Sequence, residues 1–159
     1  MEFNIRFARP GDVEDMMQLI NELAVYEKEP DAVDIDAAYL KKHGFGVQPS
    51  FSCFVAEDKN NTILGMALFY HRFSTWKGLT FHLEDLIVRQ QYRKQGVGKA
   101  LFEAFLNHAK TEQVNRVEWV VLDWNTNAID FYKSYNADVL DDWKTVQMDR
   151  NTIQNFKSK

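Results

Sequence analysis

The amino-acid sequence predicts an α/β fold, in which helices flank a mixed, mostly antiparallel sheet that contains a central pair of parallel strands. Segments with strand-like apolar patterns recur along the chain between segments whose apolar residues follow the helical spacing i, i+3, i+4 and i+7. One helical segment, residues 101–108, separates the apolar segments 81–88 and 116–122, an order that predicts a right-handed, parallel crossover. The 159 residues are 45% hydrophobic and contain no linker or repeat, so we expect a single domain over residues 1–159.

The first elements follow from simple periodicity. Apolar and polar residues alternate over residues 3–7, which predicts a half-buried strand. Residues 13–24 carry the apolar stripe of an amphipathic helix that we expect to end near Tyr26. A second, shorter helix is expected over residues 34–43.

The middle of the chain predicts a hairpin and then the central strand. Residues 51–57 and 62–70 have strand-like composition and are joined by a polar turn. Gly65 lies inside the second of these strands and indicates a bulge or a close backbone approach. Residues 81–88 are apolar enough for a buried strand.

The last third predicts a strand, a capped helix and a final strand. The valine-rich segment 116–122 is the partner expected for the central strand. Residues 123–127 supply capping side chains for a helix over 128–135, which Asn136 can end in the left-handed conformation. Residues 143–148 are expected to form the last strand.

Composition narrows the class of protein. The net charge of −4 argues against a general nucleic-acid binder, because phosphate contacts need a basic face. The chain has no apolar run of 18 residues and a charged N-terminus, so we expect no membrane partner and a cytoplasmic location. The single cysteine, Cys53, excludes an intrachain disulfide and is expected to be a buried, small apolar residue. No His/Cys cluster has metal-ligand spacing, so no metal is expected.

The stretch after the central strand predicts an anion site. Arg89, Arg93, Lys94 and Lys99 are not interrupted by any acid, and Gly96 and Gly98 precede a helix. Glycine allows the backbone to approach an anion, and the first N–H groups of a helix suit a phosphate or pyrophosphate. The stretch matches neither G-x-x-x-x-G-K-[ST] nor G-x-G-x-x-G, and a G-x-G pair by itself is often only a tight turn.

Two acids and one phenol are candidates for proton transfer. Glu84 and Asp85 interrupt the central strand, where neighbouring side chains are expected to point to opposite faces. Either acid could be a salt-bridge partner, or it could take a proton from an ammonium substrate. The phenol of Tyr132 could protonate a departing thiolate or could simply pack. The acids concentrated in residues 1–36 form a solvated face or a field that attracts cations.

Four motifs together resemble the diamine (spermidine/spermine-type) N-acetyltransferase family within the GNAT superfamily. They are Leu83-Glu-Asp85, Tyr92-Arg-x-x-Gly-x-Gly98, Asp123-Trp-Asn125 and Asp130-Phe-Tyr132. The resemblance implies a GNAT-like fold and acetyl-CoA as the cosubstrate. It also implies a primary amine of a small molecule as the acceptor, direct attack in a ternary complex, and a homodimer.

The resemblance also implies a role for particular residues. Tyr132 matches the general acid, and Glu84 matches the residue that relays the proton of the amine. The expected cofactor contacts are Leu86, Ile87 and Val88 to the pantetheine arm, Arg93, Lys94, Gln95, Gly96, Val97, Gly98 and Lys99 to the pyrophosphate, and Asn125, Thr126, Asn127, Ala128 and Tyr132 further along. The expected acceptor-site residues are Tyr26, Glu27, Trp76, Glu84, Asp85, Glu118, Trp119 and Asp141.

One departure from the family pattern concerns the acceptor. Ser74 and Thr75 stand before Trp76, where polyamine-acetylating members carry Asp-Pro, and this resembles the thialysine-acetylating branch. The lost carboxylate favours a short amine or a lysine-like amino acid over a long polycation. Two other functions stay open, a non-catalytic acyl-CoA-binding module and an N-acetyltransferase of protein N-termini or lysines.

Overall fold

The computed structural model describes residues 1–158, and the chain divides into two compact units, Met1–Val120 and Val121–Lys159. The first unit holds the sheet, and the second holds two short helices.

The sheet of the first unit has five strands in the order β1-β2-β3-β4-β5. Neighbouring strands are antiparallel except for the last pair, β4 and β5, which is parallel. The strands are β1 (Phe3–Phe7), β2 (Ser52–Asp58), β3 (Ile63–Ser74), β4 (Gly78–Val88) and β5 (Val117–Glu118). The predicted fold class, a mixed and mostly antiparallel sheet flanked by helices, is therefore confirmed. The predicted central position of the parallel pair is wrong, because β4 and β5 lie at one edge of this sheet.

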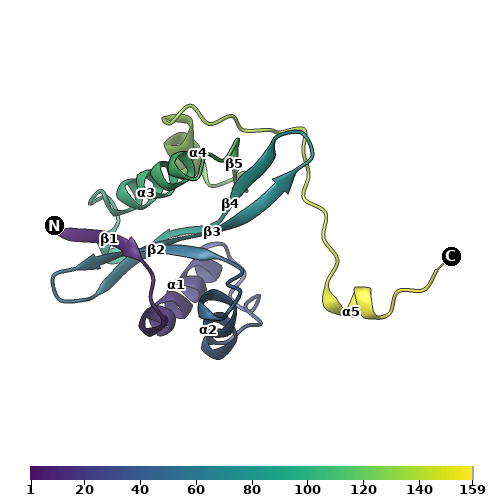
Figure 1. Cartoon of the computed structure of the whole chain (residues 1–159), viewed down its shortest axis with the longest axis horizontal. Coiled ribbons are helices and arrows are strands. Elements are labelled where there is room, and N and C mark those ends of the chain that lie inside the picture. The colour runs from purple at the N-terminus through teal and green to yellow at the C-terminus, as the bar shows by residue number, and fades with distance from the viewer. Residues whose placement is uncertain (159) are drawn as a thin grey trace. The chain divides into compact units, whose positions relative to one another are not determined.

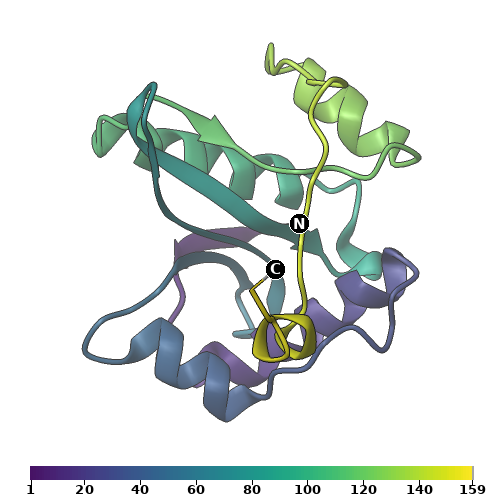
Figure 2. The ribbon, with the colours of Figure 1, turned by 90° about the vertical axis from the view of Figure 1, so that its right-hand side faces the viewer.

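Helices cover both faces of the sheet (Figure 1). α1 (Val13–Tyr26) and α2 (Ala37–Phe45) lie on one face, and α3 (Val97–Thr111), which links β4 to β5, lies on the other. Figure 2 shows the same three layers from the side. Single 3₁₀ turns precede α1 at Pro10–Asp12 and follow β4 at Gln90–Tyr92.

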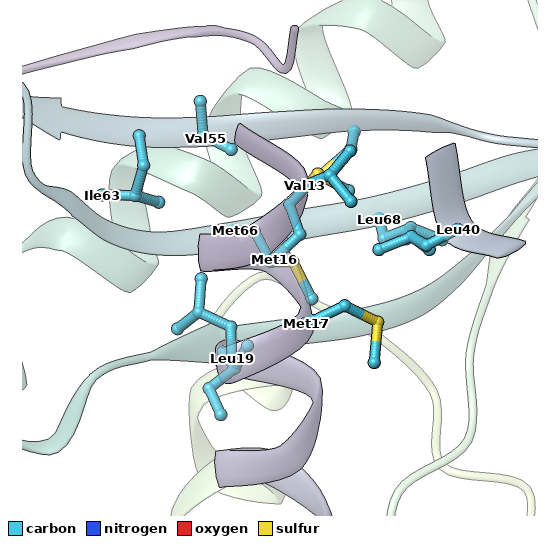
Figure 3. Packing of buried hydrophobic residues seen from close by; sticks show 11 residues of the cluster. Val13, Met16, Met17, Leu19, Leu40, Val55, Ile63, Met66 and Leu68 are labelled. Atoms are coloured by element: carbon cyan, nitrogen blue, oxygen red, sulfur yellow. The ribbon is translucent and has the colours of Figure 1, made fainter. Parts of the chain in front are cut away.

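The two faces of the sheet have different cores. On the α1 side, Met16 and Leu19 are fully buried against aliphatic and methionine side chains such as Val55 and Met66 (Figure 3). On the α3 side the core is aromatic, and the ring of Phe69 lies 5.1 Å from that of Phe105, measured between ring centroids. Burial of these side chains is the main contribution that fixes the helices on the sheet.

Gly65 confirms the predicted close approach. A Cβ atom at this position would lie 2.5 Å from the carbonyl oxygen of Ile87, a distance that no side chain tolerates. The register of β2 and β3 also shifts beside it, between Ala56 and Glu57. The glycine thus lets β3 and β4 pair closely next to the end of β4.

Several predicted strands differ from the structure. The hairpin of β3 and β4 is longer than predicted, whereas β5 contains only Val117–Glu118 instead of residues 116–122. The strand predicted over residues 143–148 is wrong, because this segment is irregular and its large apolar side chains, including Trp143 and Val146, are exposed. Strand propensity is not enough where no neighbouring strand accepts the backbone hydrogen bonds.

The second unit contains α4 (Thr126–Lys133) and α5 (Arg150–Gln154). As predicted, Asn125 caps α4, since its side-chain oxygen accepts a hydrogen bond from the Ala128 N–H at 3.4 Å. Asn136 follows α4 in the left-handed conformation, with φ of 60°. α5 was not predicted, and Asp149 caps it by accepting from the Thr152 N–H at 2.7 Å.

Candidate active site

The backbone between β4 and α3 forms a sharply turned loop, which we call the anion loop (residues 89–99). Lys94 and Gly96 both adopt left-handed conformations, with φ of 61° and 85°. The first intrahelical hydrogen bond of α3 runs from the Ala100 N–H to the Gly96 carbonyl. The N–H groups of the three residues between them therefore have no acceptor within the helix and lie at its positive end. This geometry fits an anion.

The two glycines of the anion loop meet different requirements. At Gly96 there is open space where a Cβ would stand, so glycine is favoured there by the positive φ and not by a lack of space. Gly98 has an ordinary φ, and a Cβ there would contact the Val88 side chain at 3.4 Å. The small residue at position 98 thus allows the first turn of α3 to pack beside the end of β4.

Two arginine side chains of the anion loop are less available for binding an anion than the sequence indicates. Arg89 donates to Glu22 at 2.6 Å and to Asp15 at 2.7 Å, so its charge is neutralised by α1. Arg93 donates through Nε to the Val88 carbonyl at 2.9 Å, and its guanidinium lies 5.0 Å from the centre of the Tyr26 ring. Arg89 therefore fixes the loop to α1 and is not free for a phosphate.

One edge of β4 is open next to the anion loop. β3 pairs with β4 from Gly78 to Val88, but β5 pairs only with Phe81 and His82. Within residues 1–158, no strand continues this pairing along the segment that contains Leu86, Ile87 and Val88. Unpaired strand edges bind extended ligands through the backbone, so this edge suits the predicted pantetheine contacts.

A β-bulge brings two acids to the same cavity. Leu68 pairs with Asp85, but Phe69 pairs with Leu83, so Glu84 is an extra residue in β4. A bulge breaks the strict alternation of side chains. Glu84 and Asp85 consequently line one cavity, and the prediction that they point to opposite faces is wrong.

The cavity has a volume of about 710 Å³ and lies on the α1 side of the sheet. We call it the acid-lined cavity. Its lining residues are Ile20, Ala32, Val33, Asp34, Ile35, Tyr39, Leu40, His43, Ser50, Phe51, Leu68, Tyr70, Glu84 and Asp85. This volume is in the range of pockets that hold small molecules.

Electrostatics in the acid-lined cavity centre on Asp85. Burial raises the pKa of Asp85 to about 7, and the negative charges of Glu84 and Glu27 add to the shift. Burial also raises the pKa of Glu27. The Tyr70 hydroxyl donates to Glu84 at 2.9 Å, and burial together with this bond raises the pKa of Tyr70 to about 12. Asp85 is therefore a carboxyl group that exchanges its proton near neutral pH.

Glu118, predicted for the acceptor site, is held in an ion-pair cluster at the sheet edge. It pairs with Arg72 and accepts from Arg116 at 2.8 Å. The His82 ring lies between Glu118 and Glu84, with its nitrogens 4.0 Å and 3.8 Å from their carboxylate oxygens. Burial lowers the pKa of His82, against the opposing effect of Glu84. Glu118 does not line the acid-lined cavity.

The predicted aromatic acceptor residues do not line the cavity either. Trp119 packs edge-to-face on Phe102, with ring centroids 5.5 Å apart, on the α3 side of the sheet. Trp76 lies in the turn of the β3–β4 hairpin and is 80% exposed. Tyr26 and Glu27, at the end of α1, are closer to the predicted site residues. Tyr26 contacts Arg93 of the anion loop, and the charge of Glu27 acts on Asp85.

The predicted residues of the second unit cluster around α4. Asn125 to Ala128 form its cap and first turn, and Tyr132 lies one turn later, half-buried with its ring 5.4 Å from that of Phe131. Asp141 is exposed in a turn. The cofactor contacts and the acid role predicted for these residues stay predictions.

Four titratable residues of the cavity were missed from the sequence. They are Asp34, Tyr39, His43 and Tyr70. No motif marks them, because their side chains converge only when α2 packs on the sheet. The one available signal was Asp34, an acid at the start of a predicted helix in an acidic segment.

Within residues 1–158, no group of three His, Cys, Asp or Glu side chains is arranged to hold a metal ion. None of the helices there is both long and apolar enough to cross a membrane. Cys53 is buried, as predicted, and burial raises the pKa of its thiol far above the ordinary value.

Comparisons with known proteins agree with this geometry. The sequence model described as the acetyltransferase (GNAT) family matches residues 13–136. The thialysine N-epsilon-acetyltransferase of Bos taurus is 38% identical over 140 residues, which are 84% of this chain and 82% of the relative. The spermidine/spermine N(1)-acetyltransferase-like protein 1 of Homo sapiens is 35% identical over 141 residues, 85% of this chain and 20% of the relative.

The solved structures show the same fold. An integron cassette protein from the mobile metagenome of V. cholerae aligns with a TM-score of 0.78 at 21% identity, over 97% of this chain and 96% of that chain.

Proposed function

The chain belongs to the acetyltransferase (GNAT) family and is an acyltransferase, and from this premise we propose that it transfers an acetyl group from acetyl-CoA to the primary amine of a small molecule. One observation carries the proposal. A single strand, β4, ends in the anion loop, has an open backbone edge beside it, and contributes two carboxylates to an adjacent cavity. Cofactor and acceptor can therefore meet along one strand.

The residues present fit acetyl-CoA, which when bound supplies the acetyl group as a thioester. The positive-φ backbone at Lys94 and Gly96 and the start of α3 would hold the pyrophosphate. The open edge of β4 at Leu86 to Val88 would hold the pantetheine arm through backbone hydrogen bonds. The Val88 carbonyl already accepts from Arg93, so the Leu86 and Ile87 backbone groups carry most of that contact.

The carboxylate pair accounts for the proton of the amine. A primary ammonium must lose a proton before its nitrogen can attack the thioester carbon. We propose that Glu84 accepts this proton, directly or through a water molecule, with Asp85 beside it. Because the pKa of Asp85 is about 7, the pair can hold and release one proton near neutral pH. Tyr70 holds the carboxylate of Glu84 in place by its hydrogen bond.

Tyr132 completes the proposed reaction. As the C–N bond forms and the C–S bond breaks, its phenol donates a proton to the leaving sulfur. The role rests on the motif Asp130-Phe-Tyr132. The family match over residues 13–136 crosses the boundary at Val120 and includes Tyr132, which supports one functional domain made of both units.

The acceptor is proposed to be a small amine. The names of the similar proteins point to thialysine and to spermidine or spermine as acceptors, which leaves a lysine-like amino acid and a diamine as alternatives. The acid-lined cavity is lined on one side by α2 and the α1–α2 segment, and its volume of about 710 Å³ suits a small molecule.

A panel of amines with acetyl-CoA tests the proposal. The release of free CoA thiol should depend on a primary amine, and no acetylated enzyme should accumulate without the acceptor. The rival function is a non-catalytic acyl-CoA-binding module. Tight acetyl-CoA binding in calorimetry, without turnover of any amine, peptide N-terminus or peptide lysine, would establish that rival. Turnover of peptides alone would favour a protein N-acetyltransferase.

We also propose that the chain forms a homodimer and works in the cytoplasm. Exposed apolar side chains at the end of the β3–β4 hairpin, including Phe73 and Trp76, support an association surface. The buried thiol of Cys53, the only cysteine, supports a reducing compartment. A monomer mass in light scattering at micromolar concentration would refute the dimer.

A further inference from the structure

One face of α1 carries a stripe of side chains that lies against the anion loop. Its four members recur at the helical spacing i, i+3, i+7 and i+11, which places them on the same side of the helix. We call them the α1 stripe, and they are Asp15, Gln18, Glu22 and Tyr26. The first three contact Arg89, and the last contacts Arg93. Each member therefore contacts an arginine of the anion loop.

Arg89 makes most of these contacts. Its Nη2 donates to Asp15 at 2.7 Å and to Gln18 at 3.1 Å, and its Nη1 donates to Glu22 at 2.6 Å. Its Nε donates to the Ile63 carbonyl at 2.9 Å, at the start of β3. Hydrogen bonds between a guanidinium and a carboxylate are among the stronger ones in proteins. One side chain thus joins the first residue of the anion loop to α1 and to β3.

Apolar burial contributes little to holding the anion loop. Ile87 and Val97 are buried, but every side chain between them is at least partly exposed. A loop that is not held in place loses conformational freedom when a ligand orders it, and this loss reduces the affinity for the ligand. The contacts of the two arginines with the α1 stripe reduce that loss in advance.

We infer that Asp15 and Glu22 strengthen the binding of acetyl-CoA, although their charges have the same sign as its pyrophosphate. The inference rests on the proposed function. Both acids act through Arg89, which holds the anion loop in its binding conformation, so they are positioning residues. Arg89 is then a structural contact of the cofactor site and not a ligand of the phosphates.

The sign of one effect separates positioning from direct charge. Removing an acid near an anion site strengthens anion binding if charge alone acts. Asp15→Asn and Glu22→Gln should instead lower acetyl-CoA affinity by about 3-fold each and by about 10-fold together. Glu14→Gln is the matched control, at an exposed acid of α1 outside the stripe, and should leave the affinity unchanged or slightly higher. Calorimetry measures all four proteins below the temperature at which any of them unfolds.

A double-mutant cycle tests whether Arg89 is the link. Arg89→Met should lower acetyl-CoA affinity by about 10-fold, and adding Glu22→Gln to it should cause no further loss, because the contact is already absent. Arg89→Lys keeps the charge but not the planar fork, so it should restore only part of the affinity. A further 3-fold loss in the combined variant would show that Glu22 does not act through Arg89.

Two acetyl donors separate the anion loop from a general loss of structure. S-Acetylpantetheine ends before the pyrophosphate, so its reaction does not use the loop. The combined Asp15→Asn and Glu22→Gln variant should lower kcat/KM for acetyl-CoA by about 10-fold and leave kcat/KM for S-acetylpantetheine unchanged. A change that merely loosens α1 would lower both.

The outcomes distinguish the positioning role from the reaction. Unchanged or higher acetyl-CoA affinity in the combined variant, or an equal loss for the two donors, would overturn the role of the acids and leave the proposed function standing. Absence of acetyl-CoA binding by the unmodified protein would overturn the proposed function, and the positioning role with it.

Discussion

The anion loop and the acid-lined cavity lie at opposite ends of one stretch of β4, yet they are built from different parts of the chain. The anion loop is local and made mainly of backbone, with Lys94 and Gly96 in left-handed conformations over a helix start. The cavity is made of side chains from distant segments, from Ile20 to Asp85. The comparison shows that one strand can join a site fixed by local backbone geometry to a site fixed by tertiary packing.

The two regions also reduce stability in different ways. In the anion loop the cost is backbone strain, since a residue with a Cβ in the left-handed region is less stable there. In the acid-lined cavity the cost is a partly buried carboxyl group with two acids nearby. Both costs are expected at functional sites, and each can be removed separately.

The largest effect is expected from a change that spares both regions. Tyr132→Phe removes one proton donor and keeps the ring, so kcat should fall by about 10²–10⁴-fold while acetyl-CoA affinity changes little. Steady-state kinetics and calorimetry together check this. Near-normal kcat would mean that Tyr132 contributes only packing. A large loss of acetyl-CoA affinity would mean that it mainly binds the cofactor.

The next largest effect concerns the stability cost in the cavity. The folded protein holds the Asp85 proton more tightly than the unfolded chain does, so stability declines as pH rises from about 4 to about 7. Asp85→Asn removes this loss and should raise the free energy of unfolding by roughly 1–3 kcal/mol at pH above 7, with little change near pH 4. Thermal unfolding at both pH values measures the effect, with Asp31→Asn as the exposed control. Equal shifts at the two pH values would contradict the burial argument.

A smaller effect is expected from strain in the anion loop. Gly96→Ala adds a Cβ to a residue with φ of 85°, which costs about 1–2 kcal/mol. If the variant loop relaxes when empty, acetyl-CoA affinity should fall by about 5–30-fold. Gly11→Ala is the matched control, because Gly11 has an ordinary φ and no atoms near its Cβ position. Unchanged affinity in Gly96→Ala would mean that the loop conformation is not needed for binding.

The smallest effect separates backbone from charge at Lys94. Lys94→Gly and Lys94→Ala remove the same charge, but only glycine relieves the positive φ of 61°. The glycine variant should therefore be more stable than the alanine variant by about 1 kcal/mol in denaturant unfolding. Both should bind acetyl-CoA within about 3-fold of the unmodified protein, because the backbone makes the site. A much larger loss of affinity in both variants would assign the binding to the lysine charge instead.

The same contrast explains what could be predicted from the sequence. The anion loop was predictable because two glycines, a basic stretch and a helix start are adjacent in the chain. The bulge at Glu84 was not, because it depends on how β3 and β4 pair, and the period-2 rule then placed Glu84 and Asp85 on opposite faces. Arg89 was counted with the phosphate-binding charges because its partners Asp15 and Glu22 come from α1, far away in sequence.

The exposed segments show the opposite error. Residues 143–148 have strand-like composition, but the structure gives them no strand partner, and their apolar side chains remain exposed. Asn136 and Asn125, by contrast, were predicted correctly, because helix caps depend only on neighbouring residues.

The pH dependence of kcat/KM at saturating acetyl-CoA tests most directly whether the carboxylate pair removes the proton of the amine. Activity should rise through about pH 7 as Asp85 ionises. Glu84→Gln should lower the rate and move this rise in activity to lower pH, because Asp85 ionises more easily without a negative neighbour. Asp85→Asn should abolish the rise near pH 7. A rise of kcat/KM that stays near pH 7 in both variants would contradict a role of the carboxylate pair in removing the proton.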